Sequence, residues 1–297
     1  MKSLCFLILI SITFSGFAAD SEIDAVKKIL STPHRDSSKL PWQDHAEDLK
    51  PLGNKAIPLL ATLLKDGSFA YDACQTMLVI DSNKAAPLIF ASMPKSDSNV
   101  QYHTFKFFVS RLHEGAKLPF VSAIHDAAVR CLNRQTVGEE GEPELIAIGL
   151  TGSDADFPLL ERFYNNKDVT EYWRLRFQNA AESALARLGH PKYLKHIEDE
   201  LAKPVPSPLR GDRAYPLQEA IIKAGFSQNP RFIPLLASHL NDPTPDIPVS
   251  DVLDLPYPSG AAALALDQIV NHASPELWNT KIDWKKWWKE NKHKFSK

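Results

Sequence analysis

The residues of this chain that could carry chemistry do not form a familiar catalytic pattern. There is no Gly-x-Ser-x-Gly turn for a nucleophilic serine, no glycine-rich phosphate loop and no His-Glu-x-x-His pair. His190 and His196 are six positions apart, whereas metal ligands on one helix face are spaced by three or four. We therefore interpret both histidines as exposed side chains, and we expect neither a metal nor a cofactor.

Two other clusters have simple explanations. Four glutamates lie between residues 139 and 144 in a glycine-containing stretch, where like charges are normally solvated. The segment Arg210-Gly211-Asp212 matches the adhesion tripeptide of integrin ligands, but a match of three residues is common by chance. Neither cluster indicates a specific activity.

A repeated motif indicates how the chain is divided into helices, and these helices must position any functional residue. Pro58, Pro87, Pro158 and Pro234 each stand between an apolar residue and a Leu-Leu or Leu-Ile pair, at intervals of 29, 71 and 76 positions. These intervals are one or about two periods of the 30–40 residues typical of helical-pair repeats. Since proline is tolerated in the first turn of a helix, each motif predicts the start of the second helix of a pair.

The first helices of the pairs should precede these motifs. Apolar residues recur with a 3.6-residue period in segments 69–80, 101–112, 177–188 and 217–224. Gly189 and Gly225 follow two of these segments and are themselves followed by prolines, which is typical of a glycine at a helix C-terminus. No convincing run of alternating residues predicts a strand. We predict an all-α fold, a right-handed α-solenoid (superhelix) of stacked antiparallel helix pairs.

With these motifs and this period, the chain resembles the HEAT-repeat family, including HEAT-like proteins that many bacteria export. The resemblance covers roughly residues 50 to 272, and the repeats within it are degenerate. It implies the solenoid architecture, but HEAT arrays serve many roles and it does not imply one function. Some HEAT-like relatives are enzymes, namely bilin lyases and DNA glycosylases that remove alkylated bases.

The N-terminal segment predicts export. Residues 1–18 combine Lys2, an apolar stretch and Gly16-Phe17-Ala18 before a cleavage point, as in a secretory signal peptide. The mature chain should begin at Ala19, or at Asp20, and a retained anchor is the alternative. A bacterial source would make the compartment periplasmic, or the protein secreted, and would disfavour the lyase and glycosylase activities. Residues 19–52 are then predicted to be N-terminal capping helices and residues 53–272 the repeats.

The last segment, 273–297, is predicted to be a capping helix. Trp284, Trp287 and Trp288 fall on one helix face after Asp283. Residues 281–297 have a net charge of +5, and residues 19–280 a net charge of −8. Because a solenoid requires its terminal repeat to be covered, we favour burial of the tryptophan face. The alternatives are an amphipathic helix on anionic lipid and a docking segment for a partner or nucleic acid.

The mature chain retains Cys74 and Cys131, both on apolar helix faces. We interpret them as small core residues, although an oxidising compartment would also permit a disulfide.

The connections between pairs provide the best functional hint. Segments 134–142, 203–216 and 242–259 are long, and in a solenoid such connections emerge on the same edge, which is often the binding edge. Neutral surface insertions are the alternative. We predict an interaction module or scaffold that binds a protein partner through its concave face and this loop rim, with an enzyme on a HEAT-like scaffold as the rival. A formal charge of −2 gives no general attraction to nucleic acid. The candidate binding residues are Arg162 on the concave face and Arg210, Asp212, Arg213, Tyr215, Asp251 and Tyr257 on the rim.

Overall fold

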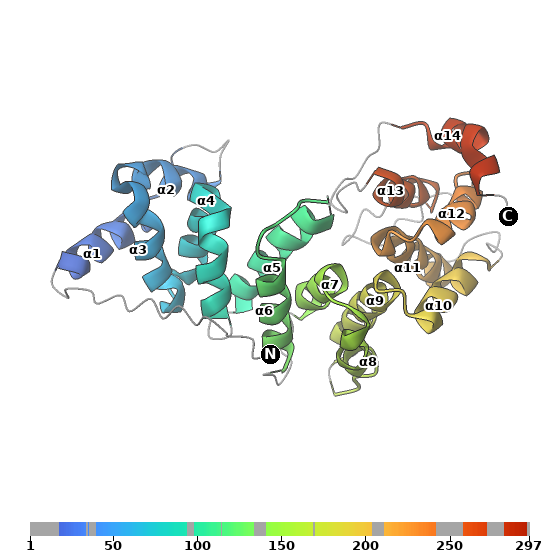
Figure 1. Ribbon diagram of the computed structural model, residues 1–297, viewed down its shortest axis with the longest axis horizontal. Coiled ribbons are helices and arrows are strands. Elements are labelled where there is room, and N and C mark those ends of the chain that lie inside the picture. The colour runs from blue at the N-terminus through green and yellow to red at the C-terminus, as the bar shows by residue number, and fades with distance from the viewer. Residues whose placement is uncertain are drawn as a thin grey trace, which may run out of the picture. The chain divides into compact units, whose positions relative to one another are not determined.

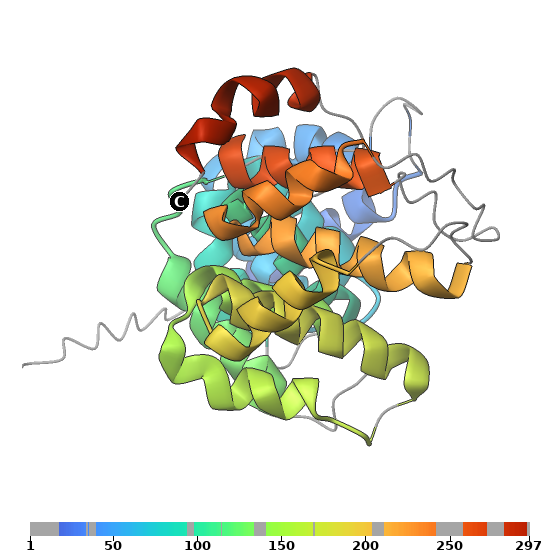
Figure 2. The ribbon, with the colours of Figure 1, turned by 90° about the vertical axis from the view of Figure 1, so that its right-hand side faces the viewer.

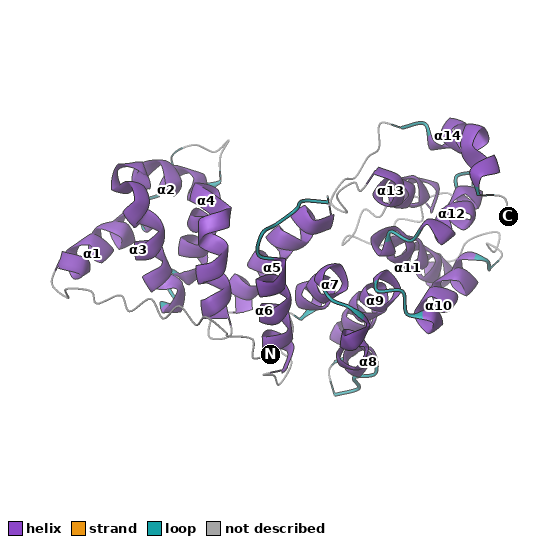
Figure 3. Cartoon of the chain, in the orientation of Figure 1, coloured by secondary structure: helices purple, strands orange, loops and turns teal. Residues whose placement is uncertain are grey.

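Every regular element that the computed structural model describes is a helix (Figure 3). The described residues are 18–33, 35, 40–93, 98–113, 115–133, 141–168, 170–203, 211–241, 258–271 and 282–295. The all-α prediction is confirmed, and within these ranges no strand occurs. None of the described helices is long and apolar enough to cross a membrane. The helices form two compact units that divide between Asp97 and Ser98 (Figure 1).

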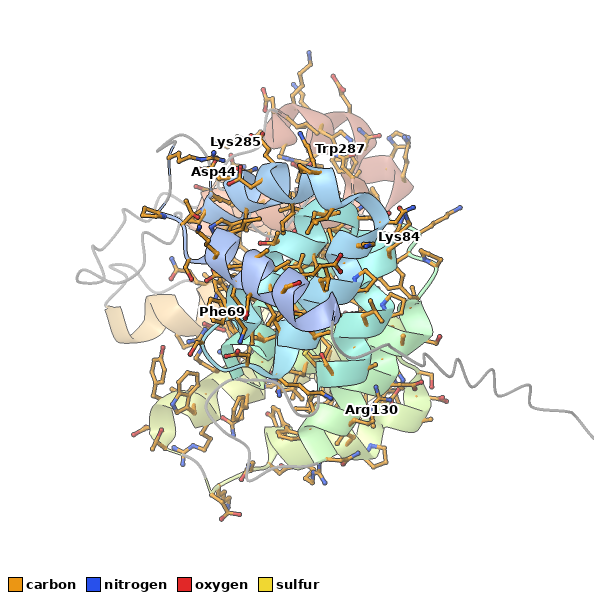
Figure 4. The ribbon with its side chains drawn as sticks, turned by 90° about the vertical axis from the view of Figure 1, so that its left-hand side faces the viewer. Asp44, Phe69, Lys84, Arg130, Lys285 and Trp287 are labelled. Carbon is orange, nitrogen blue, oxygen red and sulfur yellow. The ribbon has the colours of Figure 1, made fainter. Side chains whose placement is uncertain are left out.

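The described part of the first unit consists of α-helices and the short 3₁₀ segments between them. They are α1 (Ala18–Leu30), α2 (Pro41–Leu49), η1 (Lys50–Lys55), α3 (Ala56–Thr62), η2 (Leu63–Lys65) and α4 (Ala70–Ser92). Helix α4 packs on both α2 and α3. The backbone of Asp81 is not helical, so α4 consists of two helices joined at a kink. Figure 4 looks onto this unit, with Asp44 on α2, Phe69 just before α4 and Lys84 after the kink.

The second unit contains the remaining helices. They are α5 (Ser98–His113), α6 (Val121–Asn133), α7 (Glu142–Thr151), η4 (Asp154–Asp156), α8 (Phe157–Tyr164), α9 (Glu171–Arg187), α10 (Pro191–Leu201), α11 (Gly211–Ser227), η5 (Pro230–Phe232), α12 (Ile233–His239), α13 (Pro258–Asn271), α14 (Trp284–Asn291) and η6 (Lys292–Lys294). The odd-numbered helices pack in chain order, α5 on α7, α7 on α9, α9 on α11 and α11 on α13. Helix α12 contacts α10, α13 and α14.

One contact in this unit joins residues far apart in sequence. The Nε2 of Gln228 donates to the backbone oxygen of His113 over 3.1 Å. The His113 ring also lies against Phe226, with 5.3 Å between ring centroids. The C-terminal ends of α5 and α11 therefore meet.

Pro158 and Pro234 lie in the first turn of their α-helices, as the motifs predicted, whereas Pro87 lies deeper. Ser153 and Asn229 cap short 3₁₀ turns, and Pro158 and Pro234 follow each cap by five positions, at the start of α8 and α12. The Oδ1 of Asp81 accepts from the backbone N–H groups of Asn83 and Lys84, and Pro87 lies six positions after it. The prediction that Pro87 lies in a first helical turn is therefore wrong, because the capping carboxylate starts that helix a turn earlier.

The two glycines predicted to end helices have different roles. Gly189 has φ 86°, and the amides of Gly189 and His190 donate back to Ala186 and Leu185, which confirms a glycine C-cap. Gly225 lies inside α11, and Gln228 instead adopts the positive φ of 50° after that helix. At Gly225 the backbone approaches α13 so closely that a Cβ would lie 2.8 Å from the Cα of Ala265. The glycine allows close packing there and does not end the helix.

The core of the C-terminal helices includes the tryptophan face of α14. Trp284 is only 2% exposed and belongs to the hydrophobic cluster formed by α10 to α13. Trp287 and Trp288 are half-buried against the same cluster, together with Phe295. Asp283 accepts from the backbone amide of Lys286, as expected for its predicted N-cap role. Cys74 and Cys131 are buried, as predicted for small core residues.

Candidate functional site

The alternate helices of the second unit begin on one common edge. Near their N-terminal ends α7 and α9 are joined by Glu142 and Arg176, and near their C-terminal ends Gly149 lies against Ala184. The C-terminal ends of α9 and α11 are linked in turn by Arg187, which donates to the backbone oxygen of Phe226. Helices α7, α9 and α11 therefore run parallel, and Figure 2 shows α9, α11 and α13 running the same way. We call the edge at which they begin the N-terminal rim.

The described part of this rim carries an exposed aromatic cluster centred on Arg176. The Arg176 guanidinium lies 5.6 Å from the ring centroid of Tyr172 and 5.3 Å from that of Trp173. It donates to Glu142 Oε2 over 2.8–2.9 Å and to the Tyr172 hydroxyl over 3.0 Å. Tyr172 is 61% exposed and Leu175 45% exposed. We name Glu142, Tyr172, Trp173, Leu175 and Arg176 the Arg176 patch.

The contacts of Arg176 hold this patch in a fixed arrangement. Burial lowers the pKa of Arg176, but the nearby Glu142 and Tyr172 outweigh that effect and the net shift of the pKa is upward. The guanidinium stays charged and joined to a carboxylate and two rings. The exposed rings of the patch are thus presented by a preformed network, which reduces the entropy lost when a partner binds.

Of the predicted site residues, Arg162 is the one whose side chain the structure describes. It is exposed, as are Thr62, Ala91 and Ser238 at the corresponding positions after the other proline motifs. Its guanidinium donates to the Leu132 backbone oxygen over 3.3 Å and to the Asn133 side chain over 3.1 Å. Arg162 therefore joins α8 to the C-terminal end of α6, and one of its guanidinium nitrogens is engaged within the molecule.

The other predicted residues lie mostly beyond what the structure describes. Arg210, Asp251 and Tyr257 fall outside the described residues. Asp212, Arg213 and Tyr215 are in the first turns of α11, and only their backbone is described. The prediction that 203–216 is a loop is therefore wrong for residues 211–216, because α11 begins at Gly211, six residues before the apolar stripe that predicted it.

A buried polar network joins three helices behind the rim. Glu182 on α9 is only 2% exposed; its carboxylate contacts His196 Nδ1 of α10 and accepts from Lys223 Nζ of α11 over 2.7 Å. The prediction that His196 is exposed is confirmed, and its ring also contacts this buried carboxylate. A buried carboxylate with two basic partners suits a structural link, because both carboxylate oxygens are occupied.

A second set of polar contacts lies beside this network. The hydroxyl of Tyr193, which is only 1% exposed, contacts Glu161 Oε1 and Lys192 Nζ, each over 3.3 Å. Burial and the neighbouring Glu161 raise the pKa of Tyr193. His190 is also largely covered, with its ring 4.6 Å from that of Phe157 and 4.9 Å from that of Tyr193. The two histidines therefore belong to different contacts and do not form a ligand pair.

The first unit contains a cavity of about 500 Å³. Its wall is formed by α2, η1, the start of α3 and the end of the first half of α4. Among the lining residues Leu49 and Ala56 are buried and Val79 is exposed, and Glu47 of α2 and Lys50 of η1 carry opposite charges. It is a mainly apolar hollow with mixed charge at its edge, and no single ligand chemistry follows from it.

Comparisons with family models, with curated proteins and with solved structures found no match to this chain. The functional conclusion therefore depends on the geometry described above.

Proposed function

We propose that this protein is an exported α-solenoid of the HEAT-repeat type that binds a protein partner through its N-terminal rim. The Arg176 patch is the observation that carries the proposal. An exposed tyrosine and leucine beside a half-buried tryptophan and arginine form the kind of surface that interaction hot spots use. Exposed apolar groups clustered at one place are typical of binding surfaces.

The solenoid part of the proposal is supported by the order of packing. Each odd-numbered helix from α5 to α13 contacts the next, and α7, α9 and α11 run parallel. That order is expected of stacked helix pairs, in which each repeat packs on its neighbours. Membership of the HEAT-repeat family is part of the same proposal and depends on the proline motifs.

The segments that precede the helices of the rim favour it over other surfaces as the contact site. The segments 204–210 and 242–257 lead into α11 and α13, the helices that follow α9 in the row. The sequence-based candidates Arg210, Asp251 and Tyr257 lie in these two segments, and Asp212, Arg213 and Tyr215 in the first turns of α11. The patch and these candidates would then contribute to one contact surface.

Site-specific photo-crosslinking tests the contact. A photoreactive amino acid at position 172 should form a discrete adduct in cells of the source organism, and one at position 88 should not. Leu88, which is 40% exposed in the first unit, provides the matched control. An adduct should disappear when Leu175 is replaced by Ser and Arg176 by Ala. Equal adducts at both positions, or none at position 172, would exclude the rim as the contact surface.

Export is tested separately by the mass of the mature protein. If residues 1–18 are a signal peptide, intact protein from the cell envelope should begin at Ala19 or Asp20. A mass that includes Met1 to Ala18 would contradict export by cleavage but would not affect the rim.

A further inference from the structure

A cationic face of α14 remains exposed after its tryptophan face is buried. Lys285, Lys286 and Lys289 are exposed, as are Lys292 and Lys294 in η6. We define these five lysines as the lysine face. Helical spacing places Lys285 and Lys289 on one stripe of α14, on a different side from Trp284 and Trp287, and Lys292 follows at the start of η6. We propose that the lysine face adsorbs the protein electrostatically to an anionic phospholipid surface, without inserting its tryptophans.

The packing of α14 determines how its charges are presented. Trp284 is buried, and Trp287, Trp288 and Phe295 pack on the same cluster. An amphipathic helix that inserts into lipid needs its apolar face free. Here that face is already occupied by the protein's own core, so only the polar side is available. The mode of binding that remains is attraction between lysines and headgroups.

The distribution of charge along the chain fits such a surface. Residues 281–297 carry a net charge of +5, while residues 19–280 carry −8. A uniformly basic protein would bind any polyanion in many orientations, whereas this chain would be repelled through most of its surface. Glu290 is the one acidic residue within α14, and Asp283 is occupied in capping its N-terminus. A flat anionic surface accommodates several lysines at once, so we favour it over a single acidic partner.

Lysine adjacent to an anionic membrane contributes about 1 kcal/mol, which corresponds to roughly fivefold in partitioning. Three lysines should therefore contribute on the order of a hundredfold. The attraction should weaken as salt rises above about 0.1 M, where the Debye length is ~10 Å.

Co-sedimentation of the full chain with vesicles tests the proposal. The vesicles contain equal parts of phosphatidylglycerol and phosphatidylcholine, and pure phosphatidylcholine vesicles are the neutral comparison. The triple variant Lys285→Gln, Lys286→Gln, Lys289→Gln should reduce partitioning to the anionic vesicles by on the order of a hundredfold. Replacement of the same residues by arginine should preserve it.

The matched control has the same change in net charge at exposed lysines elsewhere. Lys65, Lys117 and Lys167 are all exposed and none belongs to the lysine face, so replacing the three by glutamine should leave partitioning within about threefold of the parent. Brominated lipids should quench tryptophan fluorescence little, because Trp284 is buried and Trp287 and Trp288 pack against the hydrophobic cluster. Circular dichroism verifies that each variant is folded.

Several results would overturn the proposal. They are no preference for anionic vesicles, an equal loss in the control variant, or strong quenching by brominated lipid. Binding to duplex DNA with the same lysine dependence but not to vesicles would replace lipid by another polyanion. Each of these outcomes is independent of the partner at the Arg176 patch.

Discussion

Glu182 and Lys223 form an ion pair between α9 and α11, with 2.7 Å from carboxylate oxygen to Nζ and side chains only 3% and 12% exposed. The carboxylate also contacts His196 of α10. Three helices thus depend on one buried acid. Such a pair contributes little beyond what a well-packed apolar pair would give, but removing one partner leaves the other charge buried and unpaired.

We therefore expect Glu182→Gln to be strongly destabilising, by about 3–5 kcal/mol. The reason is that Lys223 would lose its carboxylate in a site that water barely reaches. Urea unfolding followed by circular dichroism measures the change. Asp199→Asn, which breaks an exposed pair with Lys195 on α10, is the control and should change the unfolding midpoint little. If the double variant Glu182→Gln, Lys223→Met is no more stable than Glu182→Gln alone, an unpaired lysine charge is not the cause.

At two glycines neighbouring helices pack so closely that replacement by alanine should cause a steric overlap. At Gly149 a Cβ would lie 2.7 Å from the Cα of Ala184, and at Gly225 it would lie 2.8 Å from the Cα of Ala265. Alanine is favoured over glycine inside a helix by about 1 kcal/mol. At each glycine a backbone Cα lies within 3.0 Å and must move, and at Gly225 the Gln268 side chain must move as well. We therefore expect the overlap to dominate and Gly149→Ala and Gly225→Ala each to cost about 1–3 kcal/mol.

Gly67→Ala provides the comparison, since nothing lies within 4 Å of a Cβ at that position. Thermal unfolding should show Gly67→Ala close to the parent and the other two below it. A stabilising effect at Gly149 or Gly225 would mean that the helices separate more easily than their packing indicates.

The buried tryptophan of α14 should be the main anchor of the C-terminal helices. Trp284→Ala removes a side chain that is 2% exposed and should cost roughly 3–5 kcal/mol. Trp288→Ala, at a half-buried position, should cost less. Hydrogen exchange measured by mass spectrometry should show that α12, α13 and α14 are the first helices to lose protection of their amides in the Trp284 variant. An unchanged stability of the Trp284 variant would contradict the capping role, whatever the lysine face binds.

Tyr193 should make stability fall at alkaline pH. Its pKa is raised by burial and by Glu161, so the neutral phenol is favoured in the folded state. The contribution is fully present below the ordinary tyrosine pKa of 10.0 and is lost as the pH rises through the higher folded pKa. Tyr193→Phe should lower stability at neutral pH by about 1 kcal/mol, through the lost hydrogen bonds.

The diagnostic measurement is the slope of unfolding free energy against pH above 10. It should be shallower in Tyr193→Phe than in the parent. Equal slopes would show that the phenol titrates alike in the folded and unfolded states.

The sequence predicts local features of this fold well, because they depend on neighbours within a few residues. The apolar stripe of 101–112 and the glycine cap at Gly189 are of this kind. Gly225 was misinterpreted because a glycine that ends a helix and one that lets two helices approach have the same local surroundings. The difference depends on Ala265, forty residues away.

The candidate sites were harder to predict for a related reason. Glu182 does not lie on the apolar stripe that starts at Phe177, so periodicity predicts it to be exposed. It is buried because α7, α8, α10 and α11 all contact α9. The small residues around it, from Ala180 to Ala186, were a signal of such close packing. Tyr172 and Trp173 were missed because α9 begins six residues before the stripe that predicted it.

The meeting of α5 and α11 through His113 and Gln228 has an evolutionary consequence. Arrays of repeated helices commonly lengthen or shorten by gaining or losing one pair, because each repeat contacts only its neighbours. Here a contact spans 115 residues and joins helices separated by two others of their row. Inserting or deleting a pair between them would move His113 away from Gln228 and Phe226. Descendants of this chain that keep this contact should therefore keep the number of helices between α5 and α11 constant.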